Sequence, residues 1–138
     1  MLPCDLSAFE LTRWVHRRSI SAGEVVESCL QRIAEVDGRP GSLDGRLDEA
    51  DDPQKIHAFI TLTADLAHQQ AESVDKKIQM GIDPGPLAGV PFTVKDIFCV
   101  KDTPTTAASR ILANFVAPYT ATPVARMLAA GAIMLGKV

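Results

Sequence analysis

The chain has 138 residues, the size of one domain, and its 46% hydrophobic and 22% charged residues are typical of a globular protein. Its 14 Lys and Arg residues against 17 Asp and Glu residues give a net charge of -3, which argues against a nucleic-acid-binding module. The longest apolar stretch, residues 129–135, is too short to span a bilayer, and the first residues do not resemble a secretion signal. We therefore expect a cytoplasmic protein that is not inserted in a membrane.

The cysteines and histidines are scattered along the sequence. Cys4, Cys29 and Cys99 form no Cys-x-x-Cys pair, and no two histidines flank a carboxylate at helical spacing. The sequence therefore predicts no disulfide framework and no metal site, and we interpret the cysteines as small buried hydrophobic residues.

Two capping boxes open the sequence, at residues 7–10 and 21–24, and each predicts the start of a helix. The first helix should end near Arg18. The second should end at residues 37–38, where a glycine can take the left-handed conformation. Residues 38–54 are rich in glycine, proline and acidic residues, which predicts a flexible acidic loop; an acidic docking loop is the alternative interpretation.

Strands and helices alternate in the rest of the sequence, which indicates a layered α/β domain. Thr63 is expected to cap the helix that follows the first strand, and Pro123 occupies the first position of a later helix. The predicted elements are a strand at 57–61, a helix at 63–81, a strand within 87–100, a helical turn at 109–115, a helix from 122 to 131 and a strand at 132–135.

Lys95 lies within a strand that carries apolar residues on both faces. Because side chains alternate along a strand, Lys95 should share its face with Thr93 and Ile97, and Asp96 should point to the opposite face. Burial penalises the charged form of an amine, so a desolvated lysine can act as a neutral general base. The alternative is a solvated lysine at the end of a strand.

Residues 131–137 have the glycine and lysine spacing of a phosphate-binding loop. Val138 replaces the hydroxyl residue that binds magnesium in such loops, and the four residues between the glycines are strand formers. We therefore expect a strand here and no binding of ATP or GTP. Thr105, Thr106 and Ser109 could line a site, but helix capping is the more common role of such residues.

Four motifs occur in the order found in the amidase signature family. They read LAGVPFTVKD at 87–96, TTAAS at 105–109, PYTAT at 118–122 and AAGAIMLGK at 129–137. The resemblance implies a layered α/β/α domain with a mixed central sheet. It also implies that residues 1–138 are the N-terminal portion of one such domain, truncated before the family's Gly/Ser-rich motif.

The same resemblance implies a Ser–cis-Ser–Lys amidohydrolase in which Lys95 is the catalytic base. The nucleophilic serine and the bridging serine belong to the Gly/Ser-rich motif, and no such motif occurs in these 138 residues. Ser109 belongs to a different motif and cannot replace them. We therefore expect this chain alone to be inactive.

Within the family, the motifs most resemble the A subunits of glutamyl-tRNA(Gln) amidotransferases. That resemblance implies glutamine as substrate, B and C subunits as partners, and Glu-tRNA(Gln) bound through the complex. No cofactor is expected in this chain; ATP and Mg²⁺ are expected on a partner subunit. The alternatives are a stand-alone amidase acting on a small amide, and a non-catalytic binding module that is complete at 138 residues.

Overall fold

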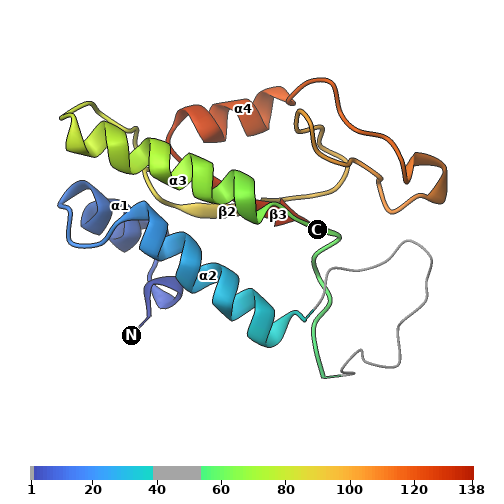
Figure 1. The fold of residues 1–138 in the computed structure, drawn as a ribbon, viewed down its shortest axis with the longest axis horizontal. Helices are drawn as coiled ribbons and strands as arrows, with labels where there is room; N and C mark the ends of the chain where they lie inside the picture. Colours follow the sequence, from blue (N-terminus) through green and yellow to red (C-terminus); the bar gives the residue numbers. More distant parts are fainter. Residues whose placement is uncertain (1, 39–53) are drawn as a thin grey trace.

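The computed structural model describes residues 2–38 and 54–138, which fold into helices packed on a small sheet (Figure 1). In chain order the elements are η1 (Pro3–Asp5), α1 (Ala8–His16), α2 (Ala22–Val36), β1 (Thr61–Leu62), α3 (Ala64–Gln79), β2 (Pro91–Val94), η2 (Arg110–Leu112), α4 (Thr122–Ala129) and β3 (Ile133–Lys137). Among the described helices, none has the length and apolar character needed to cross a membrane.

The sheet is mixed, as predicted. Its strand order is β1-β3-β2, so β3 is the central strand; it runs antiparallel to β1 and parallel to β2. Phe92 pairs with Met134 and Val94 pairs with Lys137, with an irregularity in the register between Phe92 and Thr93. The last residue of β3 is therefore a neighbour of the last residue of β2.

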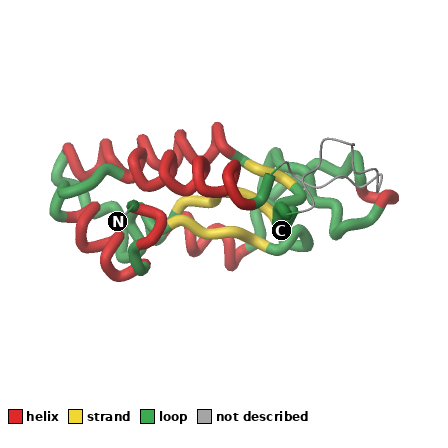
Figure 2. Tube along the Cα trace, turned by 90° about the horizontal axis from the view of Figure 1, so that it is seen from below, coloured by secondary structure: helices red, strands yellow, loops and turns green. Residues whose placement is uncertain are grey.

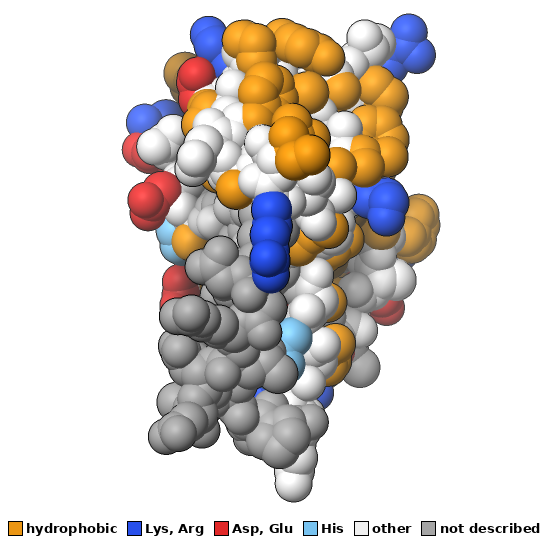
Figure 3. Space-filling view, turned by 90° about the vertical axis from the view of Figure 1, so that its right-hand side faces the viewer, with side chains coloured by type: hydrophobic (Ala, Val, Ile, Leu, Met, Phe, Trp, Pro, Cys, Tyr) orange, Lys and Arg blue, Asp and Glu red, His pale blue; other side chains and the backbone are white. Residues whose placement is uncertain are grey.

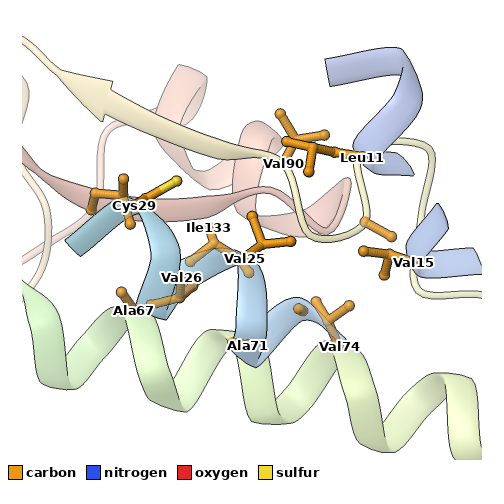
Figure 4. Close-up of a cluster of buried hydrophobic side chains, with 13 residues drawn as sticks. Leu11, Val15, Val25, Val26, Cys29, Ala67, Ala71, Val74, Val90 and Ile133 are labelled. Atoms are coloured by element: carbon orange, nitrogen blue, oxygen red, sulfur yellow. The ribbon is translucent and has the colours of Figure 1, made fainter. Parts of the chain in front are cut away.

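Helices cover both faces of the sheet, which confirms the predicted three-layer arrangement (Figure 2). The side chains of β3 alternate between the two layers because successive residues of a strand point to opposite faces. Ile133 and Leu135 pack with α1, α2 and α3, where apolar side chains converge as Figure 4 shows. Met134 packs on the other face, with Val124 of α4 and Val94 of β2.

The first two helices begin where the capping boxes predict. The Ser7 hydroxyl accepts a hydrogen bond from the Glu10 amide at 3.3 Å, and the Ser21 hydroxyl accepts one from the Glu24 amide at 3.1 Å. Each glutamate carboxylate accepts a bond from the amide of its serine in return. Gly38, with a φ of 78°, follows the C-cap of α2, as predicted.

The prediction for the first strand is wrong by several residues. The sequence places it at residues 57–61, but β1 is Thr61–Leu62. The Asp37 carboxylate accepts hydrogen bonds from the amides of Ala58 at 2.6 Å and Phe59 at 3.2 Å, so these amides are unavailable to a sheet. Thr63 is the N-cap residue of α3, as expected, but its hydroxyl donates to the Met134 carbonyl at 3.3 Å and makes no capping hydrogen bond.

The strand predicted within residues 87–100 is short. β2 covers only Pro91–Val94, because the chain turns directly after it and the Phe98 amide donates to the Lys95 carbonyl at 3.0 Å. The helical turn near residue 110 and the final strand are confirmed, whereas α4 begins at Thr122, which places Pro123 at its second position and not at its first. The acidic loop predicted at 38–54 lies almost entirely outside the described residues.

Two glycines set the position of β2 beside β3. Gly131 has a φ of 90°, and a Cβ there would lie 2.4 Å from the Pro84 carbonyl oxygen. Gly85 has a φ of 105°, and a Cβ there would lie 2.4 Å from the Ala130 carbonyl oxygen. The turn before β2 and the turn before β3 therefore pack backbone against backbone, at a distance that only glycine allows.

Candidate active site

Lys95 follows β2 directly, at the carboxyl end of a parallel pair of strands. It lines a pocket of about 310 Å³ between β2 and α4. Apart from Thr93 and Lys95, the lining side chains are apolar: Phe92, Val94, Phe98, Pro123, Val124 and Met127. Of the two interpretations of Lys95, the structure of this chain shows the solvated lysine at the end of a strand, because its side chain is exposed and β2 ends at Val94.

The predicted alternation of side chains around Lys95 is confirmed as far as Asp96. Thr93 and Lys95 are exposed, whereas Val94 is 8% and Asp96 2% exposed. Asp96 therefore does not neutralise Lys95. Its carboxylate Oδ1 lies 3.0 Å from the Nζ of Lys137, whose side chain is fully buried.

The ammonium group of Lys137 has three oxygen neighbours. Besides the Asp96 carboxylate, its Nζ bonds the Pro104 carbonyl oxygen at 2.7 Å and the Thr105 hydroxyl at 2.5 Å. Buried ammonium groups are tolerated in proteins only when they are paired in this way. The segment with the spacing of a phosphate-binding loop is thus a buried strand, as predicted. Its lysine side chain contacts other residues of the same chain.

Asp96 is held as a carboxylate by several groups. Burial by itself would raise its pKa, but the Thr106 hydroxyl at 2.5 Å, the Lys137 ammonium and the Thr106 amide at 3.0 Å outweigh burial and hold the pKa below its ordinary value. Thr105 and Thr106 are therefore buried partners of an ion pair and do not cap a helix. Ser109 precedes η2 without a side-chain cap.

The loop that carries these threonines contains two consecutive residues in the left-handed region. Ala107 and Ala108 have φ values of 48° and 53°, and each such conformation costs an alanine about 1 kcal/mol. The Ala107 amide donates to the Asp96 carbonyl at 3.0 Å, and the Ala108 amide donates to the Thr106 hydroxyl at 3.2 Å. Strain of this kind persists where surrounding contacts fix the chain, and it is common at functional sites.

Lys137 is the residue that the sequence reasoning missed. In the sequence, Lys137 stands out only as part of a segment with the spacing of a phosphate-binding loop. Asp96 is predicted only to point to the face of the strand opposite Lys95. A signal was present, because a lysine that ends a run of buried strand residues needs a carboxylate partner. The one nearby carboxylate predicted to point into the interior was Asp96.

Hydrophobic side chains are exposed at the end of the molecule that carries this loop. Figure 3 shows hydrophobic side chains gathered on this face. The exposed large ones between residues 97 and 119 are Ile97, Phe98, Ile111, Leu112, Phe115, Val116 and Tyr119. The pocket beside Lys95 shares Phe98 with this surface.

The cysteines are free thiols in different surroundings. Cys29 is buried, as predicted, and burial together with the nearby Cys4 raises the pKa of its thiol to about 11. Cys4 and Cys99 are half-buried. Within residues 2–38 and 54–138, no group of three or more His, Cys, Asp or Glu residues is placed to hold a metal ion.

Comparison with known proteins decides the family. The family model described as Amidase matches residues 42–138, which is most of the chain. The chain belongs to the amidase family. Among curated relatives of this chain, the A subunit of the glutamyl-tRNA(Gln) amidotransferase of Thermobifida fusca is 44% identical over 132 residues, which cover 96% of the chain. The protein of the same name from Cyanothece is 39% identical over 128 residues, or 93% of the chain.

Solved structures agree with the amidase fold. A structure described as a vestigial protein complex that reveals the origins of an s-triazine catabolic enzyme superposes with a TM-score of 0.81 at 29% identity, over 96% of this chain and 26% of that one. The peptide amidase of Stenotrophomonas maltophilia superposes with a TM-score of 0.77 at 28% identity, over 96% of this chain and 24% of its own. The amidase chain spans 23% of the length of the two curated relatives named above.

Proposed function

We propose that this chain is the N-terminal part of the glutamine-hydrolysing A subunit of a glutamyl-tRNA(Gln) amidotransferase, with Lys95 as its catalytic base. The observation that carries the proposal is the 39–44% identity to the A subunits of such amidotransferases over nearly the whole chain. The position of Lys95 supports its role, because the amine lies at the carboxyl end of a parallel strand, where ligands bind in open α/β sheets.

The proposed chemistry is acyl transfer through a serine ester. The nucleophilic serine attacks the side-chain carbonyl of glutamine, and its proton passes through the bridging serine to the amine of Lys95. The proton then goes to the leaving nitrogen, ammonia departs, and water hydrolyses the ester to glutamate. Both serines would come from the part of the protein beyond these 138 residues.

Within the described residues, no hydrogen bond or ion pair occupies the Lys95 side chain, whereas Lys137 has all three of its protons engaged. Of these two lysines, only Lys95 is free to exchange a proton with a reacting group. The proposed partners are the B and C subunits, with Glu-tRNA(Gln) bound through the complex and with ATP and Mg²⁺ on a partner subunit.

A stand-alone amidase is the second candidate. Superposition on a peptide amidase and on a bacterial aryl acylamidase, with TM-scores of 0.77 and 0.76, favours it. The pocket beside Lys95 is lined mainly by apolar side chains, which suit an uncharged amide. The two candidates share the catalytic base and differ in substrate and partners.

The deciding experiment starts with the native protein, isolated from its source cells together with the chains that remain bound to it. Ammonia release is measured with glutamine and with small amides, with and without Glu-tRNA(Gln) and ATP. The amidotransferase subunit should hydrolyse glutamine, and the tRNA and ATP should accelerate it. Hydrolysis of small amides with no response to tRNA would identify the stand-alone amidase, and no hydrolysis at all would identify a binding protein.

Replacing the base tests the role of Lys95. Lys95→Ala should lower kcat by about 10²–10⁴-fold, because the serine loses its proton acceptor. Lys95→Arg should be equally inactive, because a guanidinium keeps its charge at any working pH. Lys101→Ala, at an exposed lysine six residues further along, is the matched control and should leave kcat unchanged. Normal turnover in Lys95→Ala would refute the assignment.

A further inference from the structure

We propose that the buried Asp96–Lys137 ion pair is a positioning device for Lys95. This inference rests on the proposed function, because it requires Lys95 to be the base. It assigns a role to two residues that do not themselves touch the substrate.

The backbone on both sides of Lys95 is attached to the same residue. The Val138 amide donates to the Val94 carbonyl at 2.9 Å, and the Asp96 amide donates to the Val138 carbonyl at 2.8 Å. The backbone of Lys95 therefore lies between Val94 and Asp96, which are both hydrogen-bonded to Val138 at the end of β3. Only its own side-chain torsions remain free.

The side chain of Asp96 then fixes the direction of Lys95. Its carboxylate contacts Lys137 and accepts two bonds from Thr106, all on the buried side of the strand. Because adjacent side chains of an extended chain point to opposite faces, Lys95 must point toward the pocket. Turning the amine away through the backbone would pull Asp96 out of these contacts.

The pair also fixes the loop that packs behind Lys95. Lys137 holds this loop at Pro104 and Thr105, and the Asp96 carbonyl accepts from the amide of Ala107. The left-handed conformations of Ala107 and Ala108 are unfavourable by themselves, so the loop depends on these contacts. Loss of the pair should loosen the loop and the residues around Lys95 together.

The expected effect is a loss of turnover without a loss of substrate binding. A misplacement of about 1 Å in a catalytic group can cost about 10²-fold in rate. Removing the pair should therefore lower kcat by about 10- to 100-fold and change KM by less than about twofold.

The test uses the double variant Asp96→Asn/Lys137→Met in the native protein with its partner chains. Both replacements are uncharged and similar in volume to the residues they replace, so the fold is retained while the ion pair is lost. Glutamine hydrolysis, or hydrolysis of the amide found to be the substrate, is measured across pH. With its base misplaced, the variant should move part of the way toward the profile of Lys95→Ala, in which the rate keeps rising with pH because hydroxide replaces the base.

Asp37→Asn is the matched control. Asp37 is another buried carboxylate with two backbone partners, at the end of α2. Its loss should lower stability while leaving KM and the shape of the pH profile unchanged. If the double variant does not fold, Thr106→Val, which removes the hydroxyl bond to the Asp96 carboxylate but leaves the ion pair in place, is measured in the same way.

The outcomes separate this inference from the proposed function. Normal turnover in Lys95→Ala would overturn both. An inactive Lys95→Ala beside a double variant with the parent's kcat would overturn only the positioning role. The positioning role would also be overturned if the pH profile of the double variant kept the parent's shape and its rate fell only in proportion to the unfolded fraction. A pair that only stabilises the fold would give that result.

Discussion

Two regions of the molecule are held together in different ways. The region of α1, α2 and α3 is joined by apolar side chains and by caps formed within a few residues of sequence. The region around the ends of β2 and β3 is joined by the buried pair of Asp96 and Lys137, which are far apart in the sequence. The first kind of region tolerates the loss of single contacts, whereas the second fails when either partner is removed.

The physical basis of this difference is the cost of an unpaired charge. An apolar cluster loses the transfer free energy of the atoms removed, plus a cavity term, and its neighbours partly relax. A buried ion that loses its partner keeps its full desolvation penalty. The predictions below use this contrast, from the largest expected effect to the smallest.

Lys137→Met should have the largest effect on stability. It leaves the Asp96 carboxylate buried without its cation, and breaking a buried pair in this way costs about 3–5 kcal/mol. Urea unfolding of the purified protein measures the change. The matched control is Lys76→Met, which removes an exposed ion pair with Glu72 and should cost no more than about 0.5 kcal/mol. Equal losses for the two variants would show that burial does not distinguish the pairs.

Acid should weaken the same region. Because the pKa of Asp96 in the folded state lies below its ordinary value of 3.8, its contribution to stability is present above that value and is lost as pH falls through the folded-state pKa. The difference in unfolding free energy between the parent and Asp96→Asn should therefore shrink as pH falls below about 4. A difference for Asp96→Asn that is constant down to about pH 2 would contradict the prediction.

Ser21→Ala should have the smallest effect. It removes the hydroxyl that caps α2 and should cost about 1 kcal/mol in the free energy of unfolding. Ser73→Ala, at an exposed position within α3, is the control and should cost nothing. A loss for Ser21→Ala as large as that for Lys137→Met would remove the contrast between the two regions.

The sequence predicts the first region better than the second because the signals of the first region are local. The capping boxes at residues 7–10 and 21–24 contain donor and acceptor within four positions, so both helix starts could be predicted. The first strand was misplaced because the Asp37 carboxylate binds the amides of Ala58 and Phe59, which lie far along the chain. No pattern within a few residues of sequence predicts such a long-range hydrogen bond.

The candidate site was predicted in part for the same reason. The alternation of Lys95 and Asp96 is a local property of a strand and was predicted correctly as far as Asp96. The end of β2 after Val94 depends on β3 and on the loop near residue 105, so it could not be predicted, whereas the exposure of Lys95 agrees with the interpretation of a solvated lysine at the end of a strand. The role of Lys95 as a base stays a prediction.

The complete burial of Lys137 also affects its chemical reactivity. Acylating reagents modify exposed amines, and among the described lysines this one alone is enclosed, with its protons shared among three oxygens. Its amine becomes reactive only when the end of β3 separates from the neighbouring loop. The rate at which Lys137 is labelled in the native protein therefore reports how often the contacts behind Lys95 open.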